Sequence, residues 1–190
     1  FELPELQYAS RLNCATEILD KAVLEKGWGE RIALRGPLGT LTYADLLAQA
    51  NRIARVLVED MGLVPGNRVL LHSANTPLMA ACWFAIQKAG GIAVSTMPLL
   101  RAKELNDIIG KAQITHIIAE YGLVTELDKA RQQHPDAQQL LHIYGPDDAQ
   151  SLTRAGNLGS STISIAAGAT GDQIASQGEA VSANTGGSLT

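Results

Sequence analysis

The sequence predicts an α/β fold in which a mostly parallel sheet is flanked by helices. Residues 68–72 (RVLLH) and 92–95 (IAVS) are apolar at nearly every position, which is typical of parallel strands covered on both faces. An apolar helical segment joins these two runs, and further strand-like runs alternate with helical ones along the chain. With 190 residues, 46% of them hydrophobic, the chain is long enough for one domain, or at most two, with a buried core.

The chain begins with an irregular segment, residues 1–12, that we expect to lie along the surface as an arm. Asn13 then caps a predicted helix over residues 13–26, which Gly27 ends because glycine tolerates a positive φ. The apolar residues of this helix recur at helical spacing and are expected to form its buried stripe. They are Ala15, Ile18, Leu19, Ala22 and Val23.

A β-hairpin is predicted next, because strand-like runs at 31–35 and 40–43 flank the turn sequence GPLG at 36–39. The sequence Gly27-Trp28-Gly29 has part of the spacing of a dinucleotide-binding loop. It precedes a strand instead of following one, so it fails the structural test for that motif.

Two helices of the α/β region have clear start signals. Thr42 and Asp45 form a Thr-x-x-Asp capping pattern that begins the helix after the hairpin. Asn75 or Thr76 can cap the helix between the two apolar strands, and Pro77 suits its first position, where no N–H is needed. This second helix is apolar nearly all round, so we expect it to be sandwiched between other elements.

The alternation of strands and helices continues to about residue 145. Helices are predicted at 101–112 and 121–134, and strands at 115–119 and 139–144. Strands that alternate with helices of this length indicate a parallel sheet rather than a sandwich or barrel.

The composition changes after residue 145. Residues 155–190 contain no Lys, Arg, His or aromatic residue, and Asp172 and Glu179 are their only charges. Such a composition offers little apolar area to offset the entropy of ordering the chain. We therefore expect residues 146–190 to be a low-complexity tail, flexible or altered, with one edge strand at 160–166.

Charge and cysteine content argue against several classes of protein. The net charge is −4 and no basic run exists, which argues against nucleic-acid binding. No apolar stretch is long enough to span a membrane, and no signal peptide is recognisable. Cys14 and Cys82 form no metal-ligand spacing with the four histidines, so we expect a reducing, cytoplasmic location and no metal site.

Four segments carry a resemblance to a known family. They are LTYADL (41–46), GLVPGNRV (62–69), IQKAGGIAVSTMPLL (86–100) and RAKEL (101–105). In this order they resemble the N-terminal part of the AMP-forming acyl- and aryl-CoA synthetases of the adenylate-forming superfamily, most of all benzoate- and 2-aminobenzoate-CoA ligases. The resemblance implies that residues 1–145 are a partial N-terminal α/β subdomain of such an enzyme.

The resemblance implies a reaction that joins an aromatic carboxylate to ATP, releases pyrophosphate, and passes the aryl group from AMP to coenzyme A. ATP, Mg²⁺ and coenzyme A are the implied cofactors of the full-length enzyme. The family binds the phosphates with a Gly/Ser/Thr run followed by Pro-Lys-Gly. The candidates here, 159–162 (GSST) and 168–171 (GATG), are not followed by a lysine, since the last one is Lys129. We therefore expect this chain alone to be inactive, with no catalytic residue, no metal ligand and no bound cofactor.

Arg101 is a weak candidate for contact with a phosphate of coenzyme A. It follows the turn at Pro98, at the carboxyl end of the 92–95 strand, where open α/β sheets bind ligands. A solvated helix start is the more usual role for such a residue. The remaining polar and aromatic candidates are expected to be hydrogen-bonded structural residues (His72, His116, His134 and His142) or core residues (Cys82, Trp83 and Phe84).

Two alternatives to the aryl-CoA ligase remain open at this point. The first is an adenylation domain that loads a carrier protein instead of coenzyme A. The second is a non-catalytic α/β binding or interaction module, which the missing lysine and the nearly uncharged tail favour. A fragment of a larger domain should also expose an apolar face, so we expect self-association of this chain.

Overall fold

The computed structural model describes residues 3, 7–36, 39–145 and 152. At its centre is a parallel sheet whose strands lie in the order β4-β3-β5-β6. The strands are β3 (Arg68–His72), β4 (Ile92–Thr96), β5 (His116–Glu120) and β6 (Gln139–Ile143). The three strand pairings are parallel and without register shifts. The predicted α/β fold with a parallel sheet is therefore confirmed.

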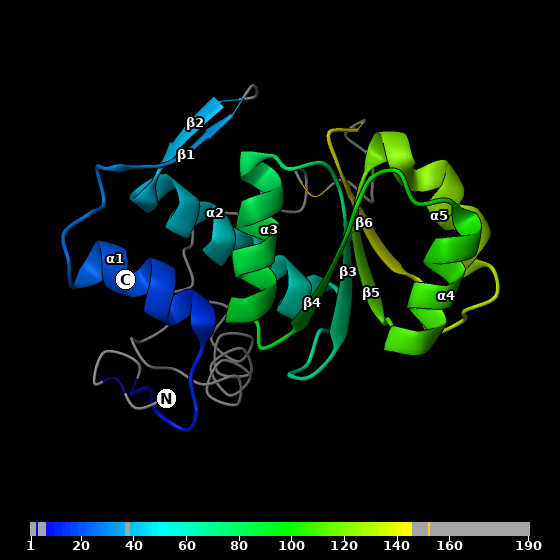
Figure 1. The fold of residues 1–190 in the computed structure, drawn as a ribbon, viewed down its shortest axis with the longest axis horizontal. Helices are drawn as coiled ribbons and strands as arrows, with labels where there is room; N and C mark the ends of the chain where they lie inside the picture. The colour runs from blue at the N-terminus through cyan, green and yellow to red at the C-terminus, as the bar shows by residue number, and fades with distance from the viewer. Residues whose placement is uncertain (1–2, 4–6, 37–38, 146–151, 153–190) are drawn as a thin grey trace.

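Helices cover both faces of this sheet. Figure 1 shows α2 (Tyr43–Arg55) and α3 (Pro77–Lys88) on one side, and α4 (Ala102–Ala112) and α5 (Val124–Arg131) on the other. The predicted hairpin is also present: β1 (Ile32–Gly36) pairs antiparallel with β2 (Gly39–Thr42). The remaining helical turns are π-helical at Thr16–Asp20 and Val56–Asp60, α-helical at Lys21–Leu24 (α1), and 3-10 at Tyr121–Leu123.

Successive side chains of the central strands enter two separate hydrophobic clusters. On β3, Val69 and Leu71 lie in a cluster with α2 and α3, which we call cluster 1. Leu70, between them, lies in cluster 2 with residues of α4 and α5. This alternation follows from the pleat of a strand, and it explains why a strand buried on both faces is apolar at consecutive positions.

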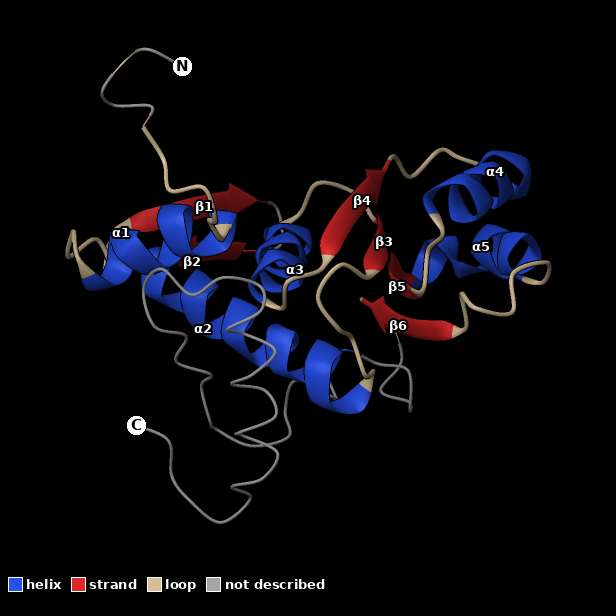
Figure 2. Cartoon of the chain, turned by 90° about the horizontal axis from the view of Figure 1, so that it is seen from below, coloured by secondary structure: helices blue, strands red, loops and turns tan. Residues whose placement is uncertain are grey.

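The predicted start signals of α2 and α3 are confirmed. The Thr42 hydroxyl accepts from the Asp45 N–H at 3.1 Å, and the Asp45 carboxylate accepts from the Thr42 N–H at 3.0 Å. Thr76 caps α3 by accepting from the Met79 N–H at 3.1 Å, with Pro77 in the first position. Figure 2 shows α3 between α2 and the sheet, as its apolar character predicts.

Three local predictions are wrong. Ile18, which the helical spacing places in the buried stripe, is 55% exposed. The π-helical turn at Thr16–Asp20 widens the helix, so Thr16 and Asp20 face inward beside the predicted Leu19, while Ile18 faces outward. The helix predicted over 121–134 is a 3-10 turn followed by α5, which ends at Arg131.

The third difference concerns β4, which the apolar run predicts to be covered on both faces. β4 is instead an edge strand that is only partly buried, and Ile92 is 47% exposed. The central strands β3 and β5 are buried along nearly their whole length. An apolar run thus predicts the strand but not its position in the sheet.

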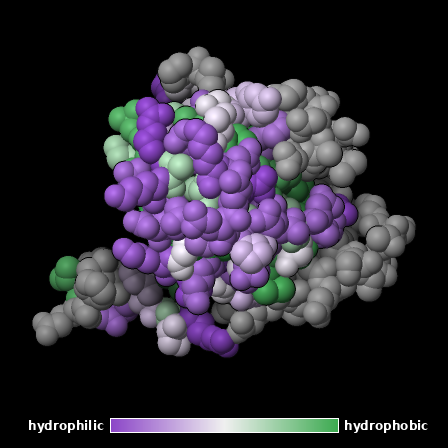
Figure 3. Space-filling view, turned by 90° about the vertical axis from the view of Figure 1, so that its right-hand side faces the viewer, coloured by the Kyte–Doolittle hydropathy of each residue, from purple (hydrophilic) through white to green (hydrophobic). Residues whose placement is uncertain are grey.

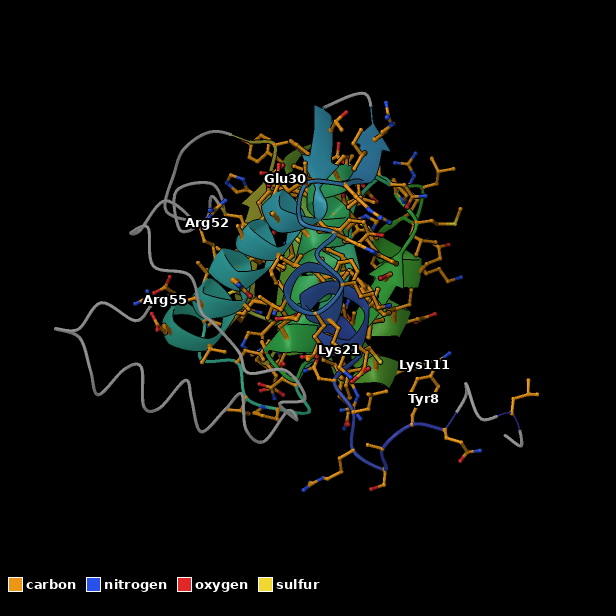
Figure 4. All side chains as sticks on the ribbon, turned by 90° about the vertical axis from the view of Figure 1, so that its left-hand side faces the viewer. Tyr8, Lys21, Glu30, Arg52, Arg55 and Lys111 are labelled. Carbon is orange, nitrogen blue, oxygen red and sulfur yellow. The ribbon has the colours of Figure 1, made fainter. Side chains whose placement is uncertain are left out.

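The outward faces of the helices are polar. Figure 3 shows a mostly hydrophilic surface over α4 and α5, where Lys103, Asp107 and Lys111 are exposed. On the opposite side, Figure 4 shows Arg52 and Arg55 projecting outward from α2. None of the helices in the described part of the chain combines the length and apolar character that a membrane span requires.

Candidate functional site

The carboxyl ends of the four parallel strands meet at one edge of the sheet. The chain runs from β3 to β4 on one side and then crosses to β5 on the other side of β3. The order of strands therefore reverses between β3 and β5, and open α/β sheets bind ligands at the carboxyl end of such a switch point. We call this edge the carboxyl edge.

A carboxylate bridges the two strands at the switch point. Glu120 ends β5, and its Oε2 accepts from the Ser73 hydroxyl at 3.3 Å and from the Ala74 N–H at 3.2 Å. Ser73, directly after β3, is 2% exposed. The sequence analysis did not single out Ser73 or Glu120. The sequence nevertheless contains a signal for them: Ser73 directly follows one strand and Glu120 ends another. The carboxyl ends of parallel strands lie at the same edge of a sheet, where ligands bind.

His72 lies beside this bridge at the end of β3 and is 1% exposed. Its Nδ1 lies 2.9 Å from the Thr96 hydroxyl oxygen on β4. That hydroxyl also donates to the Leu71 carbonyl at 3.5 Å. Burial lowers the pKa of His72, although the nearby Glu120 charge partly opposes this shift. His72 is therefore a neutral imidazole whose Nε2 has no hydrogen-bond partner among the described residues.

The other histidines have structural contacts, as predicted. His116 Nε2 donates to the Met61 carbonyl at 3.0 Å, and burial lowers the pKa of this imidazole. His134 Nε2 lies 3.0 Å from Asn106 Oδ1. The ring of His142 lies edge-on to Tyr121, with centroids 5.0 Å apart.

Arg101 lies at the start of α4, exposed to solvent. Its N–H donates to Glu104 Oε2 at 3.0 Å, and the next N–H, of Ala102, donates to Glu126 Oε2 at 3.1 Å. The pKa of Glu126 is lowered, first by the hydrogen bond from Lys129 and to a smaller extent by the charge of Arg101. The structure thus gives Arg101 a carboxylate neighbour on α5, and among the described residues no hydrogen bond or ion pair joins it to the Ser73–Glu120 bridge.

The predicted core residues lie in the core. Cys82 is fully buried, and burial raises the pKa of its thiol to about 12, which makes it a poor nucleophile. Trp83 and Phe84 are partly buried against cluster 1, with ring centroids 5.2 Å apart. Trp28, in the glycine-flanked sequence, lies edge-on to Tyr43 at 5.9 Å, which agrees with a packing role for this segment.

The sequence analysis missed one buried ion pair. Lys88, at the end of α3, donates to both carboxylate oxygens of Asp20, at 2.5 and 2.6 Å. The two side chains are 0% and 3% exposed. Nearby, the Asn13 side-chain amide donates to the Gln87 carbonyl at 2.8 Å, while Asn13 Oδ1 caps its own helix. These contacts attach the N-terminal helix to α3, far from the carboxyl edge.

The described part of the carboxyl edge lacks the groups that ATP and Mg²⁺ require. The phosphates require several donors and a cation, whereas the switch point presents the carboxylate of Glu120. Among the described residues, no group of three or more His, Cys, Asp or Glu side chains is arranged to hold a metal ion. The described residues at this edge therefore do not fit these groups. The loop candidates at 159–162 and 168–171 and the predicted strand at 160–166 lie outside the described residues.

The fold and this edge define a class, that of doubly wound α/β domains with a switch point between β3 and β5. Within this class, the model of the family described as AMP-binding enzyme matches residues 20–177. The chain therefore belongs to the AMP-binding enzyme family, the adenylate-forming ligases, as the four sequence segments indicate.

The relatives of this chain include ligases of several kinds. A salicyl-AMP ligase / salicyl-S-ArCP synthetase from Mycobacterium tuberculosis is 35% identical over 96 residues, which cover 48% of this chain and 17% of that protein. Crotonobetaine/carnitine–CoA ligase from Shigella flexneri is 31% identical over 60% of this chain and 22% of its own length. Triostin synthetase I from Streptomyces triostinicus is 28% identical over 72% of this chain and 25% of its own length. The chain thus spans at most about a quarter of these relatives.

Solved structures share the fold. An anthranilate CoA ligase, AuaEII, in complex with anthranoyl-AMP aligns with a TM-score of 0.67 and 22% identity over 72% of this chain and 26% of its own. A benzoate CoA ligase from Burkholderia xenovorans LB400 aligns with a TM-score of 0.67 and 20% identity over 82% of this chain and 30% of its own. At this level of identity the likeness concerns the fold of the chain.

Proposed function

We propose that this chain is the N-terminal part of an ATP-dependent, AMP-forming ligase that converts an aromatic carboxylate into its coenzyme A thioester. The family match over residues 20–177 is the observation that carries this proposal. The shared fold of an anthranilate and a benzoate CoA ligase supports the choice of an aromatic acid. In this proposal residues 1–145 are the N-terminal subdomain and 146–190 the tail.

The reaction has two steps. A carboxylate oxygen attacks the α-phosphorus of ATP and pyrophosphate leaves, and then the thiol of coenzyme A attacks the acyl carbon and AMP leaves. Mg²⁺ would neutralise phosphate charge in the first step. Because the carboxyl edge does not fit the phosphates of ATP, the role that we propose for the described residues other than Arg101 is to hold later segments in place. We place the enzyme in the cytoplasm, where both cysteines would remain free thiols, as they are in the structure.

Pyrophosphate exchange tests this function directly. The full-length protein should exchange labelled pyrophosphate into ATP when benzoate or 2-aminobenzoate is present and should then form the coenzyme A thioester. The 190-residue chain alone should show no exchange. Exchange by the short chain would contradict its proposed inactivity, and a full-length protein without exchange for any aromatic acid would contradict the substrate class.

Arg101 is the residue that we propose for coenzyme A binding, because it is exposed just beyond the carboxyl end of β4. Loss of one charge-assisted hydrogen bond to a phosphate corresponds to a roughly tenfold weaker affinity. In the full-length enzyme, Arg101→Ala should raise KM for coenzyme A about tenfold and leave pyrophosphate exchange unchanged. Lys103→Ala, on the same exposed helical turn, is the matched control and should leave both quantities unchanged. Equal effects of the two variants would rule out a specific role for Arg101.

The second candidate function is an adenylation domain that transfers its product to a carrier protein. The 35% identity with a protein named salicyl-AMP ligase / salicyl-S-ArCP synthetase favours it. The two candidates share the first step and differ in the acceptor thiol. Mass spectrometry of the thioester, after incubation of the full-length protein with coenzyme A or with a pantetheinylated carrier, distinguishes them.

A further inference from the structure

β4 forms an edge of the parallel sheet, and no other described strand pairs with its free side. It pairs with β3 on one side only, whereas β3 and β5 have neighbours on both sides. The two edges differ in burial: β6, at the other edge, is buried at four of its five positions, and β4 at none. Figure 2 shows β4 at the margin of the sheet, with no described element beside its free side.

The geometry of β4 identifies which of its backbone groups face outward. The Ile92 N–H donates to the Asn67 carbonyl at 2.8 Å, so Ile92 faces β3. In a parallel pair alternate residues face the same neighbour, so Val94 and Thr96 also face β3. Ala93 and Ser95 therefore direct their N–H and C=O groups away from the sheet.

The β4 edge lacks three of the usual protections against strand pairing. Exposed edges are commonly blunted by charged side chains, proline or a bulge. Residues 92–97 (IAVSTM) contain no charge and no proline, and the pairing of β4 with β3 shows no register shift. Three large apolar side chains along and just beyond this edge are exposed: Ile92, Met97 and Leu99 are 47%, 56% and 76% exposed.

We propose that two copies of this chain associate through their β4 edges, which pair antiparallel about a two-fold axis. An uncharged strand is compatible with a second copy of itself, because no like charges are brought together. With Val94 at the axis, Ala93 of one copy lies opposite Ser95 of the other. These are the residues whose N–H and C=O groups face outward, so each such pair exchanges two hydrogen bonds.

The association is expected to be weak. One strand pair and a few exposed apolar side chains make an interface at the small end of the range for specific complexes. We therefore expect a concentration-dependent mixture of monomer and dimer with a dissociation constant on the order of 10–100 μM. The proposal does not depend on the function proposed above, because it concerns the isolated 190-residue chain.

Sedimentation equilibrium of the 190-residue chain tests the association. The weight-average mass should approach that of a dimer at concentrations about tenfold above the dissociation constant. Ile92→Lys with Met97→Lys places like charges along the edge and should raise the dissociation constant at least about tenfold. Leu24→Lys is the matched control, because Leu24 is 61% exposed at the end of α1. Figure 1 shows α1 on the far side of α3 from β4.

Amide hydrogen exchange tests the geometry. As concentration rises, exchange should slow at the outward N–H groups of Ala93 and Ser95, and should change little at Val94, which already faces β3. The proposal is overturned if the chain stays monomeric at all concentrations, if Leu24→Lys weakens association as much as the edge variant does, or if dimers form without protection of these two amides.

Discussion

At the scale of single residues, the contact between Asp20 and Lys88 is the most demanding in the described part of the chain. The two charges are removed from water almost completely, since Lys88 is 0% exposed. Burial lowers the pKa of Lys88 and raises the pKa of Asp20, and in each case the partner's charge opposes the shift. Each residue is therefore kept charged by the other, and neither is expected to tolerate the loss of its partner.

Lys88→Met should destabilise the chain by about 3–5 kcal/mol, because it leaves a buried carboxylate without a counter-charge. The free energy of unfolding in urea measures the effect. Lys21→Met is the matched control: Lys21 pairs with Glu17 on the same helix at 2.7 Å, but this pair is 31% and 24% exposed. It should leave the unfolding free energy nearly unchanged. Adding Asp20→Leu to Lys88→Met should recover most of the loss, and a single variant as stable as the parent chain would contradict this account.

At the scale of elements, the helix starts were predictable from the sequence because their signals are local. The α2 cap is made by Thr42 and Asp45, three residues apart, and the α3 cap by Thr76 next to Pro77. The inward turn of Asp20 was not predictable, because a π-helical turn changes the face that helical spacing assigns. A local pattern thus identifies an element and its first turn more reliably than its buried face.

Thr42→Ala should destabilise α2 and cost about 1 kcal/mol of stability, since it removes the side chain that accepts from the Asp45 N–H. Thr42→Ser is the control, because serine keeps the hydroxyl and caps helices equally well. Thermal unfolding followed by circular dichroism compares the two variants. Equal midpoints for the alanine and serine variants would show that the capping bond does not contribute.

Contacts between distant parts of the chain account for what the sequence did not predict, both at the carboxyl edge and between the N-terminal helix and α3. Ser73 and Glu120 are 47 residues apart, and Asp20 and Lys88 are 68 residues apart. Neither pair has a local pattern that joins its members. The alternation of strands and helices predicts the parallel sheet, but not the order of its strands, which decides which polar residues meet at the switch point and which strand lies at the edge.

At the scale of the whole molecule, clusters 1 and 2 share one sheet. Leu70 enters cluster 2, and its neighbours Val69 and Leu71 enter cluster 1. If β3 separated from one cluster, its side chains in the other cluster would also be displaced. Leu140 and Leu141 on β6 are divided in the same way. We therefore expect the described α/β region to unfold in a single cooperative transition.

The two tryptophans allow a test of this cooperativity, because both report on one side of the sheet. Trp83 packs against cluster 1, and Trp28 lies against Tyr43, which packs on the same cluster.

Ile109→Ala creates a cavity in cluster 2, where Ile109 is 1% exposed, and should destabilise the chain by about 2–5 kcal/mol. Cooperative unfolding predicts that the urea midpoints from tryptophan fluorescence and from far-UV circular dichroism fall together. Ile53→Ala, in cluster 1, is the control that should move both midpoints in either case. A fluorescence midpoint that stays at its original value in Ile109→Ala, while the dichroism midpoint falls, would show that the two faces of the sheet unfold independently.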